Sequence, residues 1–309
     1  MNSKNSLKVL TIGNSFTDSL AAFWQQVVES AGCELHFERA NHGGCELHRH
    51  WNYITNEEKD KVYRMYQNYS AKMREILARE QWDIVTIQQA SHFSWRPETQ
   101  QPFAGYIYDY VKQHAPQAEV VIQQTWAYRA DDPRIRPGGV WEFNPGIYER
   151  CRELGVTLDP GPWHISLTDM YNSLTAAYTK LATELNCRII PTGYAVQLAR
   201  KAQDGLFPNY DPELLNTLRW PDLPPQASEF VGNIWWAKNG ETGEMELRRD
   251  TIHLNARGQY LQACVWFAAL FGHKTSEVTF VPDMIGNKDA AFLRETAQKA
   301  VDEFPQVKR

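Results

Sequence analysis

Long apolar segments are absent from this chain of 309 residues. No run reaches the ~18 residues that a membrane-spanning helix needs, which excludes a transmembrane protein. A basic surplus is absent too, because 32 Lys and Arg stand against 37 Asp and Glu, a net charge of −5. That balance offers no electrostatic footprint for nucleic acid or an anionic membrane. The first ten residues hold no apolar signal core, which indicates a cytoplasmic protein or an exported one whose signal has been removed.

Cysteine is scarce, and its pattern excludes two common scaffolds. The five cysteines are an odd number without a CxxC pair, so neither a disulfide framework nor a zinc ribbon is indicated. We expect small buried side chains, and leave a Cys33–Cys45 pair open. His42, His48 and His50 surround Cys45, but their spacing matches no common metal site. We therefore expect no metal and no cofactor, and interpret the cluster as substrate contacts or a polar loop.

The residues that are present describe a folded α/β protein. Hydrophobic residues make up 43% and charged residues 22%, enough to bury a sizeable core. Short apolar runs alternate with longer amphipathic ones, which is typical of a parallel sheet covered by helices. We predict a three-layer α/β/α fold, flavodoxin-like, with a mostly parallel five-stranded sheet. The predicted strands are 7–12, 34–40, 83–87, 119–123 and 188–190, and the predicted helices 19–31, 57–79, 103–114, 167–186, 255–271 and 288–303.

Two long excursions, at about 129–163 and 205–249, interrupt this alternation and are rich in Pro, Gly, Trp and Tyr. Such excursions inside a compact domain are usually functional, so we expect a single domain, 1–309, decorated by both. Four aromatic residues flank or lie within them, and for each we leave substrate contact and plain packing open: Trp126, Tyr128, Trp235 and Trp236. Asn239-Gly240 predicts a hairpin turn, which would make the second excursion a flap over the site.

The first candidate for chemistry is Ser15, in the run Gly13-Asn14-Ser15-Phe16 between the first predicted strand and helix. Open α/β sheets place their ligands at the carboxyl ends of parallel strands. The N–H groups at a helix start also favour a developing oxyanion. Gly13 permits the sharp turn. The alternative interpretation is an ordinary helix-capping serine.

The second candidate is the pair Asp250 and His253, at the entry to the helix predicted at 255–271. A serine nucleophile needs an imidazole to take its proton, and the imidazole needs a carboxylate to fix its tautomer. Residues three apart at such a junction can present both side chains from one turn. A capping aspartate beside a core histidine is the alternative. The GxSxG elbow of α/β-hydrolases is absent.

Together, Gly13-Asn14-Ser15 near one terminus and Asp-x-x-His near the other resemble the SGNH (GDSL-type) hydrolase superfamily of esterases and lipases. The resemblance implies that Ser15 is the nucleophile and that Asp250 and His253 complete a catalytic triad. In that family the Ser15 N–H and a glycine after the second strand contribute to the oxyanion hole. Gly44 is the best match for this glycine, with Gly43 the alternative.

The sequence departs from the family after the third strand. The usual Gly-x-Asn-Asp is missing, and Ile87-Gln88-Gln89-Ala90-Ser91 stands there instead. A glutamine amide can donate the same hydrogen bond as asparagine, so the resemblance passes the oxyanion role to Gln88 or Gln89. Successive strand residues face opposite sides, and we favour Gln88. This variant is similar to carbohydrate esterases more than to lipases.

The resemblance implies a serine esterase that needs no cofactor and acts on a small-molecule or glycan ester. With the aromatic loops it points to O-acetyl groups on a carbohydrate. Within the same chemistry, a thioesterase or a lysophospholipase is the alternative. From another class, the alternative is a catalytically silent carbohydrate-binding protein that uses Trp126, Trp235 and Trp236 for stacking. The oligomeric state is left open.

Overall fold

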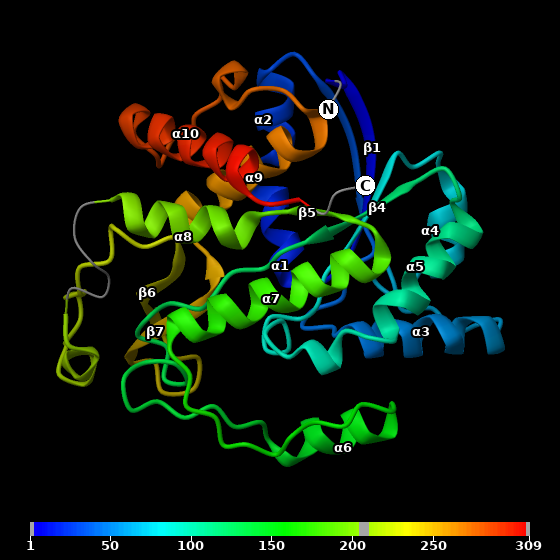
Figure 1. Ribbon diagram of the computed structural model, residues 1–309. Coiled ribbons are helices and arrows are strands. Elements are labelled where there is room, and N and C mark those ends of the chain that lie inside the picture. The colour runs from blue at the N-terminus through cyan, green and yellow to red at the C-terminus, as the bar shows by residue number, and fades with distance from the viewer. Residues whose placement is uncertain (1–2, 204–209, 307–309) are drawn as a thin grey trace.

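A five-stranded sheet forms the centre of the computed structural model, which describes residues 3–203 and 210–306 (Figure 1). The strand order is β2-β1-β3-β4-β5 and every pair is parallel. This is the flavodoxin-like order. The predicted α/β fold with a five-stranded parallel sheet is therefore confirmed. The strands are β1 (Ser6–Ile12), β2 (Glu34–Arg39), β3 (Ile84–Ile87), β4 (Glu119–Gln123) and β5 (Arg188–Ile190).

Helices cover both faces of the sheet (Figure 1). One layer holds helices that contact one another: α2 (Trp24–Ser30), α8 (Thr192–Ala202), α9 (Ala256–Phe271) and α10 (Asn287–Glu303). The opposite layer holds α3 (Leu47–Lys59), α4 (Met73–Arg79), α5 (Phe103–His114) and α7 (Leu167–Leu185). Helix α9 is buried almost all round, because it lies between the sheet and α2, α8 and α10 and carries apolar side chains on every side.

The prediction of a single helix over 57–79 is wrong. The segment holds the end of α3, a loop and α4. Two members of the supposed inner stripe, Val62 and Tyr69, are 79% and 65% exposed. The buried Lys72 ammonium donates to the main-chain carbonyls of Glu57 and Asp60. That contact folds the loop back onto the end of α3, which a helical periodicity cannot reveal.

The helix predicted over 19–31 is split into two short pieces, η1 (Ser19–Ala22) and α2, and a separate short helix, α1 (Ser15–Asp18), precedes them. Two further 3-10 turns are η2 (Pro97–Thr99) and η4 (Thr275–Glu277). The Cys33–Cys45 pair is not formed, since both residues are free and buried. Among residues 3–203 and 210–306, no helix combines the length and the apolar character that crossing a bilayer requires.

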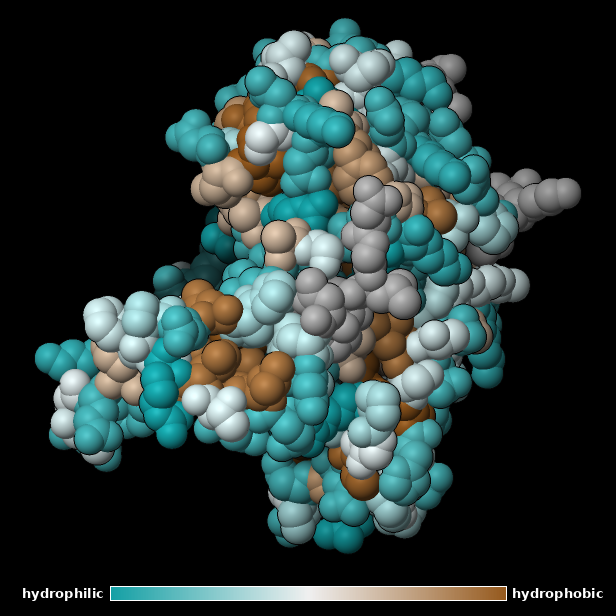
Figure 2. All heavy atoms as spheres, turned by 90° about the vertical axis from the view of Figure 1, so that its left-hand side faces the viewer, coloured by the Kyte–Doolittle hydropathy of each residue, from teal (hydrophilic) through white to brown (hydrophobic). Residues whose placement is uncertain are grey.

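Both excursions have secondary structure of their own. The first contains α6 (Pro145–Glu153) and a bridge between Trp141 and Trp163. The second contains η3 (Pro212–Asn216) and a hairpin of β6 (Val231–Lys238) and β7 (Met245–Leu254), while its residues 205–209 lie outside the described part of the chain. Figure 2 shows the side of the molecule that carries this excursion. That side is mostly hydrophilic, with hydrophobic side chains gathered in small patches.

Candidate active site

Ser15 is the first residue of α1, and only Gly13 and Asn14 separate it from the end of β1 at the carboxyl edge of the sheet. Asn14 caps this helix, because its side-chain oxygen accepts the N–H of Phe16. A Cβ on Gly13 would lie 2.6 Å from the Thr17 hydroxyl, so the tight turn depends on glycine there. The cap and the turn together hold the Ser15 hydroxyl at the sheet edge.

The Ser15 hydroxyl meets the imidazole of His253. Ser15 Oγ lies 2.9 Å from His253 Nε2, and His253 Nδ1 lies 2.8 Å from Asp250 Oδ2. Both distances are within hydrogen-bond reach, and the order nucleophile, base, carboxylate is that of a Ser-His-Asp triad. The three predicted residues are therefore brought together, across 238 positions of sequence between Ser15 and His253.

Asp250 holds its own turn as well as the imidazole. Its Oδ1 accepts the main-chain N–H groups of Ile252 and His253 at 2.8 and 3.0 Å, and Oδ2 remains for the ring. Burial raises the pKa of Asp250, but the hydrogen bonds from the His253 ring and the two N–H groups outweigh it and lower the pKa to about 2. The carboxylate is thus ionised at neutral pH and able to stabilise a developing imidazolium.

The triad turn lies at the end of β7 and is braced by the segment that follows β4. Trp126 Nε1 donates to the Ile252 carbonyl at 2.8 Å, and the Thr251 hydroxyl donates to Asp132. Gly232 on β6 adopts a left-handed φ of +78°, and a Cβ there would lie 2.1 Å from the Asp250 carbonyl oxygen. Gly232 was not predicted as a site residue, because nothing in its local sequence reports how closely β7 approaches.

A cavity of about 550 Å³ opens beside Ser15 and His253. Its aromatic wall comes from the segment after β4 and from the first excursion: Tyr128, Trp141 and Phe143. Its polar lining includes Ser91, His92, Arg134, Glu142 and Asn144. The Tyr128 and Trp141 rings are stacked at 5.3 Å, and the Arg134 guanidinium lies over both rings. A concave site with aromatic walls and a few placed polar groups is typical of small-molecule binding.

Two main-chain N–H groups at this cavity are free to donate. Ser15 and Gly44 both line it, and neither N–H has a hydrogen-bond partner in the part of the chain that the structure describes. Gly44 has a φ of +57°, a left-handed conformation that suits glycine. Gly43, the alternative from the sequence, is not among the lining residues.

The prediction that a Gln88 or Gln89 amide reaches this cavity is not supported by the structure. Gln88 Nε2 donates to the Asn14 side-chain oxygen at 2.7 Å, and its Oε1 accepts the Thr17 hydroxyl. Gln89 Nε2 donates to the Thr99 carbonyl at 2.8 Å. Both side chains are buried and neither lines the cavity. Their amides are occupied in bracing the loops around the site.

The four aromatic residues proposed as substrate contacts fall into different places. Tyr128 lines the cavity, and its hydroxyl lies 2.9 Å from Ser91 Oγ. Trp126 is fully buried beneath the site, stacked on Phe16 at 4.1 Å, so it packs against the triad instead of lining the cavity. This corrects the substrate-contact interpretation of Trp126.

Trp235 and Trp236 lie on β6 and are not among the residues that line the cavity. Trp235 is 43% exposed, and Trp236 Nε1 donates to the Asp222 carbonyl at 2.9 Å. The Asn239-Gly240 prediction holds in so far as β6 and β7 are antiparallel and joined there. The second strand of this hairpin, β7, carries both Asp250 and His253, so the hairpin positions two members of the candidate triad.

Several cavity residues were missed by sequence reasoning, chiefly His92, Arg134, Trp141, Phe143 and Asn144. Trp141, Phe143 and Asn144 belong to the first excursion, whose path cannot be read from periodicity. The position of His92 could have indicated a site residue, since it follows the Gln88–Ser91 run just beyond the carboxyl end of β3. Among the described residues, no group of His, Cys, Asp and Glu is arranged to hold a metal ion.

His50 lies outside the cavity and supports the turn that precedes Ser15. Its Nε2 lies 3.0 Å from the Gly13 carbonyl and its Nδ1 lies 3.1 Å from the Tyr66 hydroxyl, and the ring is fully buried in α3. Burial lowers the pKa of His50 to about 3, although the hydrogen bond to Gly13 acts in the opposite direction. The interpretation of His50 as a substrate contact or a polar loop residue is wrong, because it supports the turn before Ser15.

We expect His50 to make the protein less stable in mild acid. Below the ordinary histidine pKa of about 6.5, His50 binds a proton in the unfolded chain but not in the folded one. His50 therefore lowers the free energy of unfolding by about 2 kcal/mol between pH 7 and pH 5. Urea unfolding should therefore show that the free energy of unfolding of H50Q falls less between pH 7 and pH 5 than that of the parent protein, by about 2 kcal/mol. The exposed control H36Q should behave as the parent protein does, and an unchanged pH dependence in H50Q would contradict the assignment.

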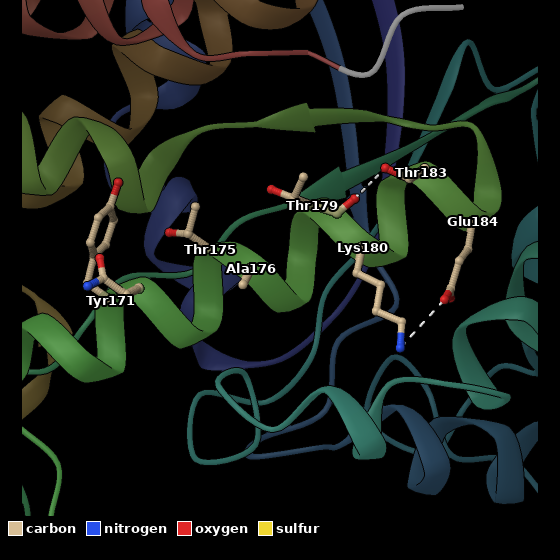
Figure 3. A pocket seen from close by; sticks show the side chains of 8 residues that line it. Tyr171, Thr175, Ala176, Thr179, Lys180, Thr183 and Glu184 are labelled. Carbon is tan, nitrogen blue, oxygen red and sulfur yellow. Dashed lines mark hydrogen bonds and ion pairs between the residues drawn. The ribbon is translucent and has the colours of Figure 1, made fainter.

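A second hollow, of about 740 Å³, runs along the outer side of α7 (Figure 3). The side chains labelled there all project from this one helix, and Lys180 pairs with Glu184 at 3.9 Å. The lining offers threonine hydroxyls but no imidazole or paired nucleophile. The smaller cavity at Ser15 is therefore the stronger candidate for an active site, because the Ser15, His253 and Asp250 contacts open onto it.

Comparison with known proteins supports the fold. Residues 8–135 match a family described as "Domain of unknown function (DUF4886)". The crystal structure of a DUF4886 family protein from Bacteroides uniformis is 22% identical, with a TM-score of 0.65 over 96% of this chain and 95% of that chain. At this level of identity the likeness shows a shared fold.

More distant structures include a protein described as a candidate SGNH hydrolase from Slackia heliotrinireducens, 19% identical over 84% of this chain and 97% of that chain, with a TM-score of 0.46. Another is phospholipase A1 from Streptomyces albidoflavus, 11% identical over 82% of this chain and 94% of that chain, with a TM-score of 0.38. No curated protein matches the sequence.

Proposed function

We propose that this protein is a serine hydrolase that cleaves carboxylic esters. The observation that carries the proposal is the contact chain from Ser15 Oγ through His253 to Asp250, at 2.9 and 2.8 Å, opening onto one cavity. A serine hydroxyl is a weak nucleophile unless a neighbouring base takes its proton. Here the base is within reach and its carboxylate partner is ionised.

The reaction follows from the positions of these groups. Ser15 Oγ attacks the acyl carbonyl while its proton passes to His253 Nε2. The carbonyl oxygen becomes an oxyanion, which the Ser15 and Gly44 N–H groups stabilise from the cavity edge. The C–O bond to the alcohol then breaks, and His253 returns the proton to the leaving oxygen. Water, activated by the same imidazole, releases the acid and restores Ser15.

The shape of the cavity favours a small acyl group on a polar alcohol. Aromatic rings at Tyr128, Trp141 and Phe143 stand beside polar groups at His92, Arg134 and Asn144, which suits a hydroxylated ring better than a fatty chain. We therefore propose an O-acetylated carbohydrate as the substrate class. On this basis the thioesterase and lysophospholipase alternatives rank lower.

The direct experiment is labelling of the purified protein with a fluorophosphonate probe, followed by rates on p-nitrophenyl acetate, butyrate and octanoate. We expect a single labelled site at Ser15 and the highest kcat/KM for acetate. An unlabelled, inactive protein that binds glycans would instead support a silent carbohydrate-binding protein. The highest kcat/KM for octanoate would contradict the proposed acetyl specificity.

A further inference from the structure

A second histidine faces the same cavity, and the proposed reaction does not use it. His92 lines the cavity five residues beyond β3, with 23% of its side chain exposed. Its ring packs at 4.5 Å from Phe93 and meets the edge of Phe143 at 6.2 Å. Two aromatic neighbours thus fix the plane of the imidazole before any ligand arrives.

One ring nitrogen of His92 is held by a buried carboxylate. Nε2 lies 3.1 Å from Glu46 Oε1, and the Glu46 side chain is only 1% exposed. Arg49 and Arg150 also reach this carboxylate, at 3.0 and 3.3 Å. Burial raises the pKa of Glu46, but the hydrogen bond from His92 and the charge of Arg49 outweigh it and lower the pKa to about 2. Glu46 is therefore an ionised acceptor, supported by two guanidinium groups.

This arrangement determines the hydrogen-bonding role of His92. An ionised carboxylate has no proton to give, so His92 Nε2 must be the donor in the contact with Glu46. In a neutral ring with its proton on Nε2, Nδ1 carries a lone pair. Among the described residues His92 Nδ1 has no hydrogen-bond partner, and it is not sealed from solvent.

We propose that His92 is a specificity-determining residue whose Nδ1 accepts a hydrogen bond from a hydroxyl group on the alcohol portion of the ester. This inference rests on the proposed function. An acetyl group fills only a small part of a 550 Å³ cavity, so the remaining walls face the alcohol. A polyol such as a sugar supplies hydroxyl donors at that position, whereas a simple alkyl ester has none.

Two esters of the same shape test this role. 2-Acetoxyethanol carries a hydroxyl where propyl acetate carries a methyl group. We expect the parent protein to prefer 2-acetoxyethanol by about tenfold in kcat/KM, the range of one well-made hydrogen bond. H92F keeps an aromatic ring between Phe93 and Phe143 but cannot accept a hydrogen bond, and should bring the ratio near one. The ratio cancels any loss of folded protein, because both rates come from one sample.

Two control variants make the result decisive. H92Q keeps a side-chain oxygen acceptor and should recover part of the preference. H164F changes an exposed histidine outside the cavity and should keep the parent ratio. The inference is overturned if H92F retains the parent preference, or if the parent protein shows no preference between the two esters.

A failure of the proposed function gives a different pattern. If the parent protein hydrolyses neither ester and takes up no fluorophosphonate, the hydrolase proposal fails, and calorimetric titration with methyl β-D-xylopyranoside then tests His92 alone. Weaker binding by H92F than by the parent protein would support the hydroxyl-accepting role, whereas equal binding, or none by either protein, would overturn it.

Discussion

Replacement of Ser15 by alanine is expected to lower kcat for p-nitrophenyl acetate by roughly 10⁵-fold, because the hydroxyl is the only group in the triad that forms a bond to the acyl carbon. S15A should also lose all labelling by a fluorophosphonate. The small residual rate would come from the Ser15 and Gly44 N–H groups, which a side-chain deletion leaves in place.

The fold should survive this change. The Ser15 side chain is half-buried and its hydroxyl contacts the imidazole of His253, while the cap of α1 belongs to Asn14. Circular dichroism and the urea midpoint of S15A should match those of the parent protein. S70A removes an exposed hydroxyl elsewhere and should keep full turnover and labelling. Undiminished turnover by well-folded S15A would refute the serine mechanism.

Exchange of Asp250 for asparagine is expected to lower kcat by roughly 10⁴-fold with little change in structure, a loss comparable to that in other serine enzymes with this replacement. The asparagine oxygen can still accept the N–H groups of Ile252 and His253, which now bind Oδ1. Its amide nitrogen then faces His253 Nδ1 as a donor. The imidazole must carry its proton on Nε2, where it cannot accept the proton of Ser15.

Two measurements separate this tautomer effect from general damage. D250N should lose fluorophosphonate reactivity in parallel with kcat, while its KM and its urea midpoint stay near the parent values. D283N, at an exposed aspartate before α10, should leave the rate unchanged. A loss of less than tenfold in D250N would mean that His253 is oriented by something other than Asp250.

Local patterns in the sequence were sufficient to predict the strands of the central sheet. Each of β1, β3 and β4 is a short β-branched run bounded by polar or turn residues, and all five predicted strands are present. The same holds for the candidate triad, since Ser15 sits in a turn after a strand and Asp250 and His253 share one turn. Sequence patterns of this kind predict the structure well, because they depend only on the conformation of the neighbouring main chain.

The errors share one cause, namely contacts between distant segments. Lys72 folds the 60–72 loop back onto α3, against the helical stripe. The Gln88 amide is held by Asn14 and Thr17, and the indole of Trp126 is buried against Phe16. In each case the residue type suited the predicted role, but a partner more than ten positions away determined where the side chain points.

By itself, the sequence determined the class of fold and the three residues that can form a triad, because the alternation of apolar segments and the order of the motifs are properties of the linear sequence. Only the tertiary structure decided what surrounds them: the two free N–H groups, the aromatic wall from the first excursion, Gly232 behind Asp250, and His92 backed by Glu46. The physical reason is that cavity walls are made by packing between segments far apart in sequence, where burial and hydrogen-bond partners, not local propensity, set the direction of each side chain.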